Sequence, residues 1–358
     1  MKRVLFITGI DVASPNIKGG GAMIAKRNYE LISLFSDVTL VAPPKKTNIL
    51  NKIGKFLSCR ICFTNKEVRA ILHLAKSGDF DIIYLDQSFH GNLLKKLKNL
   101  NAKKITFFHN VEVKYFKDVE KKLVRIVRKN EQSAVQYSDE IIVLNNRDRL
   151  GLIREYPLVN TKKIHFLPIT LKNTFIENEN QIETEEENNK KIGLFLGSFF
   201  PPNYNGIKWF VENVAEKTNA DYYIVGKGFE SVREELSRDN VIVIGETDDV
   251  ASWYKKVDFI VSPIFEGSGM KVKTCEALMY GKTIFGTDEA FEGYELDFNL
   301  VGDLCNTTNE FVEKINFRLD NNLIQKQNGY NREVFLTKYE DIIAIQKFKE
   351  VILDKEVE

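Results

Sequence analysis

Short apolar runs rich in branched residues recur along the chain and alternate with helical stretches. Uninterrupted apolar runs separated by helices are typical of a parallel sheet that is covered on both faces. In the first half these runs are residues 3–8, 37–43, 81–86, 104–109, 139–144 and 163–169, with helices expected near 22–35 and 67–76. The first half therefore predicts an α/β domain.

An acidic, almost wholly polar stretch at residues 176–191 follows and is typical of a solvated linker. Beyond it the same alternation returns, with apolar runs at residues 191–197, 221–226, 241–245, 258–263 and 282–287. A chain of 358 residues is longer than one hydrophobic core usually serves. We therefore expect two Rossmann-like domains, residues 1–175 and 192–334, facing a cleft in which a nucleotide binds at the carboxyl ends of the strands. The tail from residue 331 is amphipathic and is predicted to be helical.

The composition is ordinary for a soluble protein, with 43% hydrophobic and 28% charged residues. No apolar run reaches the roughly 20 residues that cross a bilayer, and the first residues enter a strand pattern without a cleavable signal, so we expect a cytoplasmic protein. Cys59 and Cys62 have no second Cys or His pair nearby to complete a zinc site, and no metal is expected.

The two halves carry opposite charge. Residues 1–170 hold 30 Lys and Arg against 15 Asp and Glu, whereas residues 171–358 hold 21 against 35. This split suggests an anionic partner for the first half: a membrane surface, a nucleic acid or a phosphorylated acceptor.

Two basic stretches concentrate this positive charge. Residues 48–66 and 117–129 mix lysine and arginine with apolar residues, a pattern that suits the inner face of an anionic membrane. The alternative for the second stretch is a helix that buries Ile126 and Val127 in the core and exposes its basic face to solvent. We expect no binding to nucleic acid, because no recognisable motif accompanies the charge.

The segment FEGSGMKVKTCEA, residues 265–277, lies between a strand and a helix and contains glycines, lysines and a glutamate. Gly267 and Gly269 allow the backbone to approach a ligand closely, and the amides at the start of the helix favour an anion such as a diphosphate. Lys271 and Lys273 add positive charge there. Glu276 follows Lys273 by three residues and shares its helix face, so its carboxylate can accept both ribose hydroxyls.

Other features of the loops suit a nucleotide as well. Gly20 and Gly21 begin a helix after the first strand and offer bare amides to an anion, although the sequence indicates a flexible loop without a ligand equally well. His109 follows a strand and is expected at the open edge of the sheet, where the alternative is a histidine that caps a loop. The backbone near Gly226 is a candidate for contact with the base. The sequence GKT at residues 281–283 lacks the upstream glycine of a P-loop, which disfavours a nucleoside triphosphatase.

The string GSGMKVKTCEALMYGKTIFGTDEAFEGY resembles the donor-binding region of the glycosyltransferase family 4-like transferases (glycosyl transferases group 1), and residues 192–295 match in order and spacing. The resemblance implies a GT-B fold with an acceptor domain, a donor domain and a C-terminal helix, about 335–358, that crosses back to the first domain. It also implies a role in phosphate and ribose binding for Lys273 and Glu276, and contact with the donor for Gly20, Gly21 and His109.

Further donor contacts are implied for Glu266, Met270 and Val272, although nine residues separate Glu266 from Glu276 where the commoner family pattern has seven. The family's branch with G-x-K-x-K shares the longer spacing.

The activity implied is retaining, metal-independent transfer of a hexose, with His109 and Lys273 as the catalytic residues and no cofactor. The donor is a nucleotide-diphosphate sugar, with UDP expected from the family. The acceptor is a glycan or a lipid-linked glycan in surface polysaccharide synthesis. A GT-B nucleotide-sugar epimerase and a non-catalytic GT-B subunit are the alternatives.

Overall fold

The computed structural model describes residues 1–14, 19–43, 63–119, 121–175, 190–267 and 269–353. The chain forms two compact units. The first comprises Met1–Ile169 and Asp341–Glu358, and the second comprises Thr170–Glu340. The division at Thr170 falls just before the acidic stretch, most of which lies outside the described ranges.

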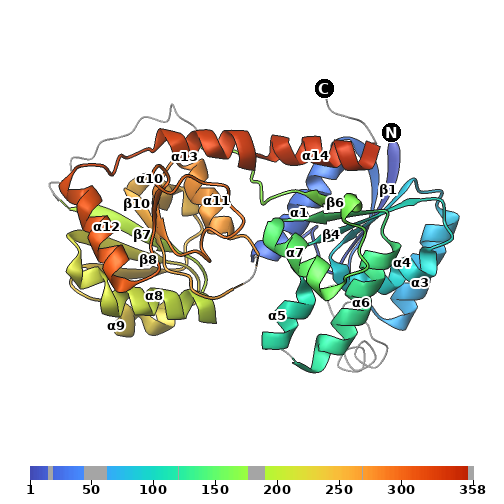
Figure 1. Ribbon diagram of the computed structural model, residues 1–358, viewed down its shortest axis with the longest axis horizontal. Helices are drawn as coiled ribbons and strands as arrows, with labels where there is room; N and C mark the ends of the chain where they lie inside the picture. The colour runs from blue at the N-terminus through green and yellow to red at the C-terminus, as the bar shows by residue number, and fades with distance from the viewer. Residues whose placement is uncertain (15–18, 44–62, 120, 176–189, 268, 354–358) are drawn as a thin grey trace. The chain divides into compact units, whose positions relative to one another are not determined.

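The first unit contains a six-stranded sheet in which all neighbouring strands are parallel (Figure 1). The spatial order is β2-β1-β3-β4-β5-β6. The strands are β1 (Lys2–Thr8), β2 (Ser36–Val41), β3 (Ile82–Asp86), β4 (Lys103–Phe108), β5 (Glu140–Val143) and β6 (Ile164–Phe166). The α-helices are α1 (Gly20–Ser33), α3 (Asn65–Ser77), α4 (Gly91–Leu97), α5 (Glu112–Val119), α6 (Val124–Tyr137), α7 (Asn146–Glu155) and α14 (Asp341–Leu353).

The strand order of this sheet reverses at β1, which lies between β2 and β3. Ligands of open α/β sheets bind outside the carboxyl ends of the strands at such a switch point. The loops after Thr8, Asp86 and Phe108 leave neighbouring strands at this edge. Residues near these three loops are therefore brought together although they are far apart in sequence.

Helix α14 carries the chain back into the first unit, as expected. It packs against α1, and the Phe348 ring meets the Tyr84 ring edge-on at 6.2 Å between centroids. The Lys103 ammonium also donates to the Val351 carbonyl oxygen at 2.8 Å. These contacts join the C-terminal helix to the centre of the sheet.

The second unit contains another six-stranded parallel sheet, with the order β12-β11-β10-β7-β8-β9. Its strands are β7 (Lys191–Leu196), β8 (Ala220–Val225), β9 (Val241–Gly245), β10 (Phe259–Ser262), β11 (Thr283–Gly286) and β12 (Gly302–Leu304). Its α-helices are α8 (Pro201–Asn213), α9 (Arg233–Leu236), α10 (Val250–Lys256), α11 (Val272–Met279), α12 (Thr308–Asp320) and α13 (Gly329–Val334). Figure 1 shows α8 and α9 on one side of this sheet and α10, α11 and α13 on the other.

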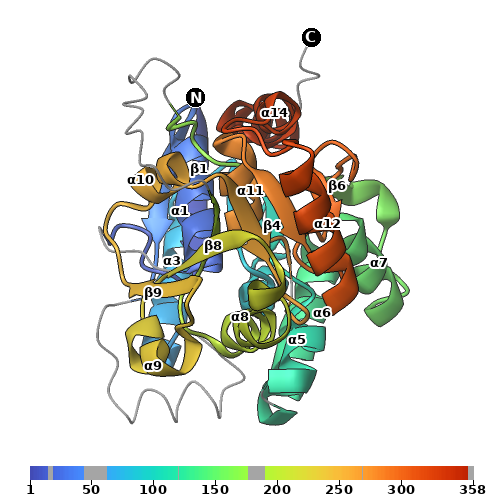
Figure 2. The ribbon, with the colours of Figure 1, turned by 90° about the vertical axis from the view of Figure 1, so that its left-hand side faces the viewer.

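The switch point of the second sheet lies between β7 and β10. The loop after Leu196 and the loop after Ser262 therefore leave adjacent strands. β8 and β9 complete the sheet on the β7 side, with β9 at its edge (Figure 2). Both units are Rossmann-like, which confirms the predicted fold class.

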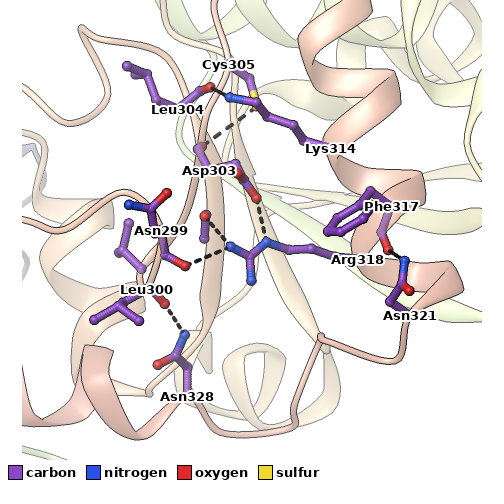
Figure 3. A network of polar contacts seen from close by, with 12 residues as sticks. Asn299, Leu300, Asp303, Leu304, Cys305, Lys314, Phe317, Arg318, Asn321 and Asn328 are labelled. Carbon is purple, nitrogen blue, oxygen red and sulfur yellow. Dashed lines mark hydrogen bonds and ion pairs between the residues drawn. The ribbon is translucent and has the colours of Figure 1, made fainter.

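The short edge strand β12 was not predicted from the sequence. A polar network joins it to α12 (Figure 3). The Arg318 guanidinium forms an ion pair with Asp303 at 2.5 Å and donates to the Gly302 carbonyl oxygen at 2.6 Å. Lys314, one helical turn earlier, donates to the Leu304 carbonyl oxygen at 2.6 Å. Side chains of α12 thus position a strand that has no apolar run of its own.

The two basic stretches differ in how far the structure describes them. Residues 48–62, together with Cys59 and Cys62, lie outside the described ranges. In the stretch 117–129, Ile126 and Val127 are buried, whereas Lys121, Lys122 and Arg125 are exposed. Its apolar positions in α6 therefore face the core.

Within the described part of the chain, no helix is long and apolar enough to span a bilayer. Over the same residues, no group of three or more His, Cys, Asp or Glu side chains is arranged to hold a metal ion.

Candidate functional site

The glycine loop before α11 has the backbone conformation that its glycines suggest. Gly267 and Gly269 have φ angles of 153° and 64°, which side-chain-bearing residues rarely adopt. Met270 is buried below the loop, and α11 begins at Val272 with Lys271 at its N-cap. No side chain caps this helix start. The first amides of α11 are therefore placed to bind an anion.

Lys273 projects from the first turn of α11 towards the carboxyl end of β7. Its ammonium donates to the Asn203 amide oxygen at 2.9 Å and lies 4.6 Å from the centre of the Phe195 ring. A Cβ on Gly197 would lie only 2.7 Å from the Lys273 Nζ, so the absence of a side chain at Gly197 makes room for the ammonium. The loop after β7, the first turn of α8 and α11 thus meet at one cation.

Glu276 lies on the same face of α11 and is held by an aromatic hydroxyl. The Tyr254 hydroxyl donates to the Glu276 carboxylate at 3.2 Å, and the Tyr254 ring stacks on Tyr280 at 4.7 Å. This arrangement places the carboxylate one helical turn from Lys273, as the spacing predicted.

Burial shifts the pKa values of both charged groups towards neutrality. It lowers the pKa of Lys273 to about 7, with Lys271 acting in the same direction and Glu276 opposing. It raises the pKa of Glu276 to about 7, while Tyr254 and Lys273 oppose this shift. Each group is therefore poised to change its charge when a polar ligand binds.

Lys271, which is predicted to bind phosphate, makes two contacts at the glycine loop. Its ammonium forms an ion pair with Glu289 at 2.5 Å and donates to the Gly269 carbonyl oxygen at 2.8 Å. Glu289 offsets the charge of Lys271, so Lys273 is the better placed cation. Glu266 is exposed at the start of the loop, and Val272 occupies the first helical position.

Gly226 allows three strand ends beside Lys273 to pack closely. Its amide donates to the Gly245 carbonyl oxygen at 2.7 Å, and its φ is 151°. A Cβ at this position would lie 1.8 Å from the Gly197 carbonyl oxygen. The backbones at the ends of β7, β8 and β9 can therefore approach only because the residue at 226 is glycine.

In the first unit the structure brings two predicted residues together. Gly20 is the first residue of α1, and Gly21 lies beside the His109 ring, with 3.8 Å between the His109 Nδ1 and the position of a Gly21 Cβ. His109 is buried, and its Nε2 lies 3.1 Å from Asp86 Oδ2. Asp86 is the last residue of β3 and is fully buried.

The backbone after Asp86 is strained. Gln87 has a φ of 128°, and its side-chain oxygen accepts a hydrogen bond from the Gly9 amide at 3.2 Å. Strained residues of this kind gather at functional sites, where the surrounding structure holds them.

The segment after His109 is held by a buried glutamate on α6. The Glu131 carboxylate accepts hydrogen bonds from the backbone amides of Glu112, at 2.8 Å, and Val113, at 3.1 Å, at the start of α5. The Tyr156 hydroxyl donates to the same carboxylate at 2.8 Å. Burial raises the pKa of Glu112 to about 8, and the adjacent Glu131 acts in the same direction. The loop that carries His109 is thereby tied to α6 and α7.

The sequence did not indicate several residues of these two sites. Asn203 and Gly197 surround the Lys273 ammonium, Tyr254 holds Glu276, and Asp86 holds His109. Only Asp86 carried a usable signal, since it is a carboxylate at the carboxyl end of a strand.

Residues 190–321 match the family described as Glycosyl transferases group 1. A comparison with curated proteins gives no match.

Solved structures match over nearly the whole chain at low sequence identity. Sucrose-phosphate synthase from Thermosynechococcus elongatus has a TM-score of 0.71 at 13% identity, covering 99% of this chain and 97% of that one. HepE from Anabaena, in complex with UDP and glucose, has a TM-score of 0.68 at 12% identity, covering 99% and 100%. WaaG, a glycosyltransferase involved in lipopolysaccharide biosynthesis, has a TM-score of 0.69 at 16% identity, covering 98% and 100%.

These likenesses establish the fold, and the family match lies within the unit that contains Lys273 and Glu276. The chain therefore has the GT-B fold, and residues 190–321, within its second unit, are similar to the Glycosyl transferases group 1 family.

Proposed function

We propose that this protein is a retaining glycosyltransferase that moves a hexose from UDP-hexose to a glycan or lipid-linked glycan in surface polysaccharide synthesis. One observation carries the proposal. Lys273 and Glu276 lie one turn apart on α11, directly after a glycine loop, in a domain similar to the Glycosyl transferases group 1 family.

The donor diphosphate would bind the first amides of α11 and the Lys273 ammonium. Charge on the diphosphate increases as the bond to the sugar breaks, so a fixed cation at this place stabilises the transition state. Asn203 holds the ammonium in position by accepting one of its hydrogen bonds at 2.9 Å. Lysine and helix amides supply the positive charge that a metal ion supplies in other transferases, so we propose a metal-independent reaction without a cofactor.

Glu276 would accept hydrogen bonds from the ribose hydroxyls. It must be ionised to accept both, and its raised pKa makes the vacant site tolerant of a neutral carboxyl group. The Tyr254 hydroxyl orients the carboxylate in either form. The phosphate and ribose contacts together select a nucleoside diphosphate.

His109 would position the donor sugar and stabilise charge, and the departing phosphate would accept the proton of the acceptor hydroxyl on the same face of the sugar. Attack on that face retains the anomeric configuration. Retention and the role of His109 both come from the resemblance of the sequence to the family 4-like transferases.

The solved structures favour UDP as the donor nucleotide and a surface glycan as the acceptor class. HepE was solved with UDP and with UDP-glucose. WaaG and the galactosyltransferase WaaB are described as lipopolysaccharide enzymes. A cytoplasmic location, with the basic part of α5 and α6 near an anionic membrane, would place this chain beside a lipid-linked acceptor.

Incubation with a panel of UDP-hexoses, with and without glycan acceptors, tests the proposed reaction by NMR. A transferase releases UDP and forms a glycoside only when an acceptor is present, and Lys273→Ala should abolish this transfer and weaken UDP binding. Epimerised UDP-sugar without acceptor would identify the epimerase alternative. Unchanged kinetics in Lys273→Ala would contradict the assigned role of the lysine.

A further inference from the structure

A second tyrosine holds the ring of Tyr254, the residue that orients Glu276. Tyr254 is fully buried on α10, and its hydroxyl lies 3.2 Å from Glu276 Oε2 and 3.4 Å from the Lys273 carbonyl oxygen. Its ring stacks on Tyr280, with 4.7 Å between the centroids and 2° between the planes. Tyr280 is the C-cap residue of α11, so the stack joins the end of this helix to the hydroxyl beside Glu276.

Tyr280 is in turn contacted by residues 171–175, here called the entry segment, through which the chain enters the second unit. The Phe175 ring meets the Tyr280 ring edge-on, with 5.7 Å between the centroids. The Thr174 hydroxyl oxygen lies 3.5 Å from the Tyr280 hydroxyl oxygen, and the Thr174 amide donates to the Met279 sulfur at 3.5 Å. All the residues in this series of contacts belong to the second unit.

Arg332 of α13 binds both the entry segment and the end of α11. Its guanidinium donates to the Met279 carbonyl oxygen at 2.8 Å and to the Asn173 side-chain oxygen at 3.0 Å. Its Cζ lies 4.8 Å from the centre of the Phe175 ring. The Phe175 amide donates to the same Asn173 oxygen at 3.2 Å. The position of the Phe175 ring is therefore fixed relative to α11.

We propose that Tyr280 and Phe175 are positioning residues, which keep the Tyr254 hydroxyl in place and thereby orient Glu276 for the ribose hydroxyls of a nucleoside diphosphate. The ribose contact rests on the proposed function, whereas the contacts behind Glu276 are those of the structure. Stacked aromatic rings have a preferred separation and offset, so a displaced Tyr280 displaces the Tyr254 ring with it. The position of the entry segment therefore affects how tightly the second unit binds ribose.

The ribose preference of the protein isolates this effect. It is the dissociation constant of the dideoxy analogue of UDP, which lacks both ribose hydroxyls, divided by that of UDP. Lys273 and the amides of α11 contact the diphosphate of both ligands, so changes in those contacts cancel in the ratio. For the natural protein at pH 7 we expect a ratio of about ten to a hundred, and Glu276→Gln should lose most of it.

Single variants separate the ring of Tyr280 from its hydroxyl. Tyr280→Leu removes the stacked ring and should lower the ribose preference by about tenfold at pH 7, and Phe175→Leu should lower it by about threefold. Tyr280→Phe keeps both ring contacts and should stay within about twofold of the natural protein. Tyr222→Leu is the matched control, because Tyr222 is likewise buried in the second unit but packs against Phe210. It should lower the unfolding temperature and keep the ribose preference.

A double variant shows whether Tyr280 acts through Tyr254. Tyr254→Phe keeps the stacked ring and removes only the hydroxyl, and it should lower the ribose preference by about tenfold. Adding Tyr280→Leu should then cause no further loss, because the hydroxyl that Tyr280 positions is already absent. The unfolding temperature shows whether each variant has folded, and Phe175→Leu replaces Tyr280→Leu in the double variant if Tyr280→Leu does not fold.

The pH dependence distinguishes a lost hydrogen bond from general damage to the site. Burial raises the pKa of Glu276 to about 7, while Tyr254 and Lys273 oppose this shift. Tyr294 also lies near Glu276, and burial raises its pKa well above the ordinary value, so it stays neutral. Loss of the Tyr254 hydroxyl raises the pKa of Glu276 further, so the preference that Tyr254→Phe and Tyr280→Leu lose at pH 7 should return in part at pH 9. A preference that stays low at pH 9 would contradict the positioning role.

Three other results would overturn the proposal. A full ribose preference in folded Tyr280→Leu and Phe175→Leu, alongside its loss in Glu276→Gln, refutes the positioning role and leaves the proposed function standing. A further loss in the double variant refutes action through Tyr254. A natural protein without any ribose preference refutes the ribose contact of Glu276, on which both proposals depend. The expected preferences in a protein that transfers no sugar from any donor would support the positioning role and refute the transferase.

Discussion

Raising the pH from 7 to 9 should weaken UDP binding, because Lys273 must be protonated to bind the diphosphate. Burial gives this lysine a pKa of about 7 in the vacant protein, well below the ordinary value of 10.5. A bound diphosphate favours the charged form and raises the pKa again. Between these two pKa values, binding takes up a proton, and affinity falls with rising pH.

The magnitude follows from the shift. With a vacant-state pKa of about 7, half of the molecules carry a charged Lys273 at pH 7 and about one in a hundred at pH 9, so Lys273 alone should lower the affinity by about 50-fold. Ionisation of Glu276, whose pKa is also about 7, opposes this by about twofold over the same range, so the net fall should be about 25-fold. A lysine with an ordinary pKa would give almost no change over this range.

Calorimetry at pH 7, 8 and 9, in buffers of different ionisation enthalpy, measures both the affinity and the proton uptake. We expect uptake of nearly one proton per UDP at pH 8.5. Lys273→Met should bind weakly at all three pH values and lose the proton uptake. An affinity that stays constant from pH 7 to 9 would refute the role of Lys273 as the titrating diphosphate ligand.

Three further outcomes are expected. Gly226→Ala places a methyl group 1.8 Å from the Gly197 carbonyl oxygen and should cost at least about 2 kcal/mol of unfolding free energy, whereas Gly329→Ala, where a Cβ meets nothing within 4 Å, should be neutral in urea titration. Arg318→Met leaves Asp303 and the Gly302 carbonyl without their donor and should cost about 2 to 3 kcal/mol in the same assay; a loss below 0.5 kcal/mol would show that the network in Figure 3 does not stabilise the sheet edge. Transfer should continue at full rate after treatment with EDTA, and its loss with recovery on adding a divalent cation would contradict a metal-independent reaction.

The sequence predicted the features that depend on local pattern. The apolar runs marked the long strands, and the glycine loop followed by a helix appears at the expected residues, with α11 beginning at Val272. The strand β12 was not predicted because its three residues, Gly302–Leu304, include a glycine and an aspartate and form no apolar run. Arg318 and Lys314 of α12 hold this strand in place.

The partners of the site residues were not predictable, since they depend on contacts distant in sequence. The ion pair between Lys271, which is predicted to bind phosphate, and Glu289 joins two loops and could not be predicted from the sequence. Asn203 reaches Lys273 across 70 positions of the chain. Asp86 and His109 meet because β3 and β4 are neighbours in the sheet. The sequence of each strand does not determine which strands lie beside it.

The most direct test of the central claim compares the dissociation constants of UDP and UMP for the natural protein and for Lys273→Met. The second phosphate should gain charge-assisted contacts with Lys273 and the start of α11, so UDP should bind the natural protein about tenfold to hundredfold more tightly than UMP at pH 7. In Lys273→Met most of this preference should disappear while the affinity for UMP changes little. An equal preference for UDP in both proteins would contradict the account, because the diphosphate would then bind somewhere other than at Lys273.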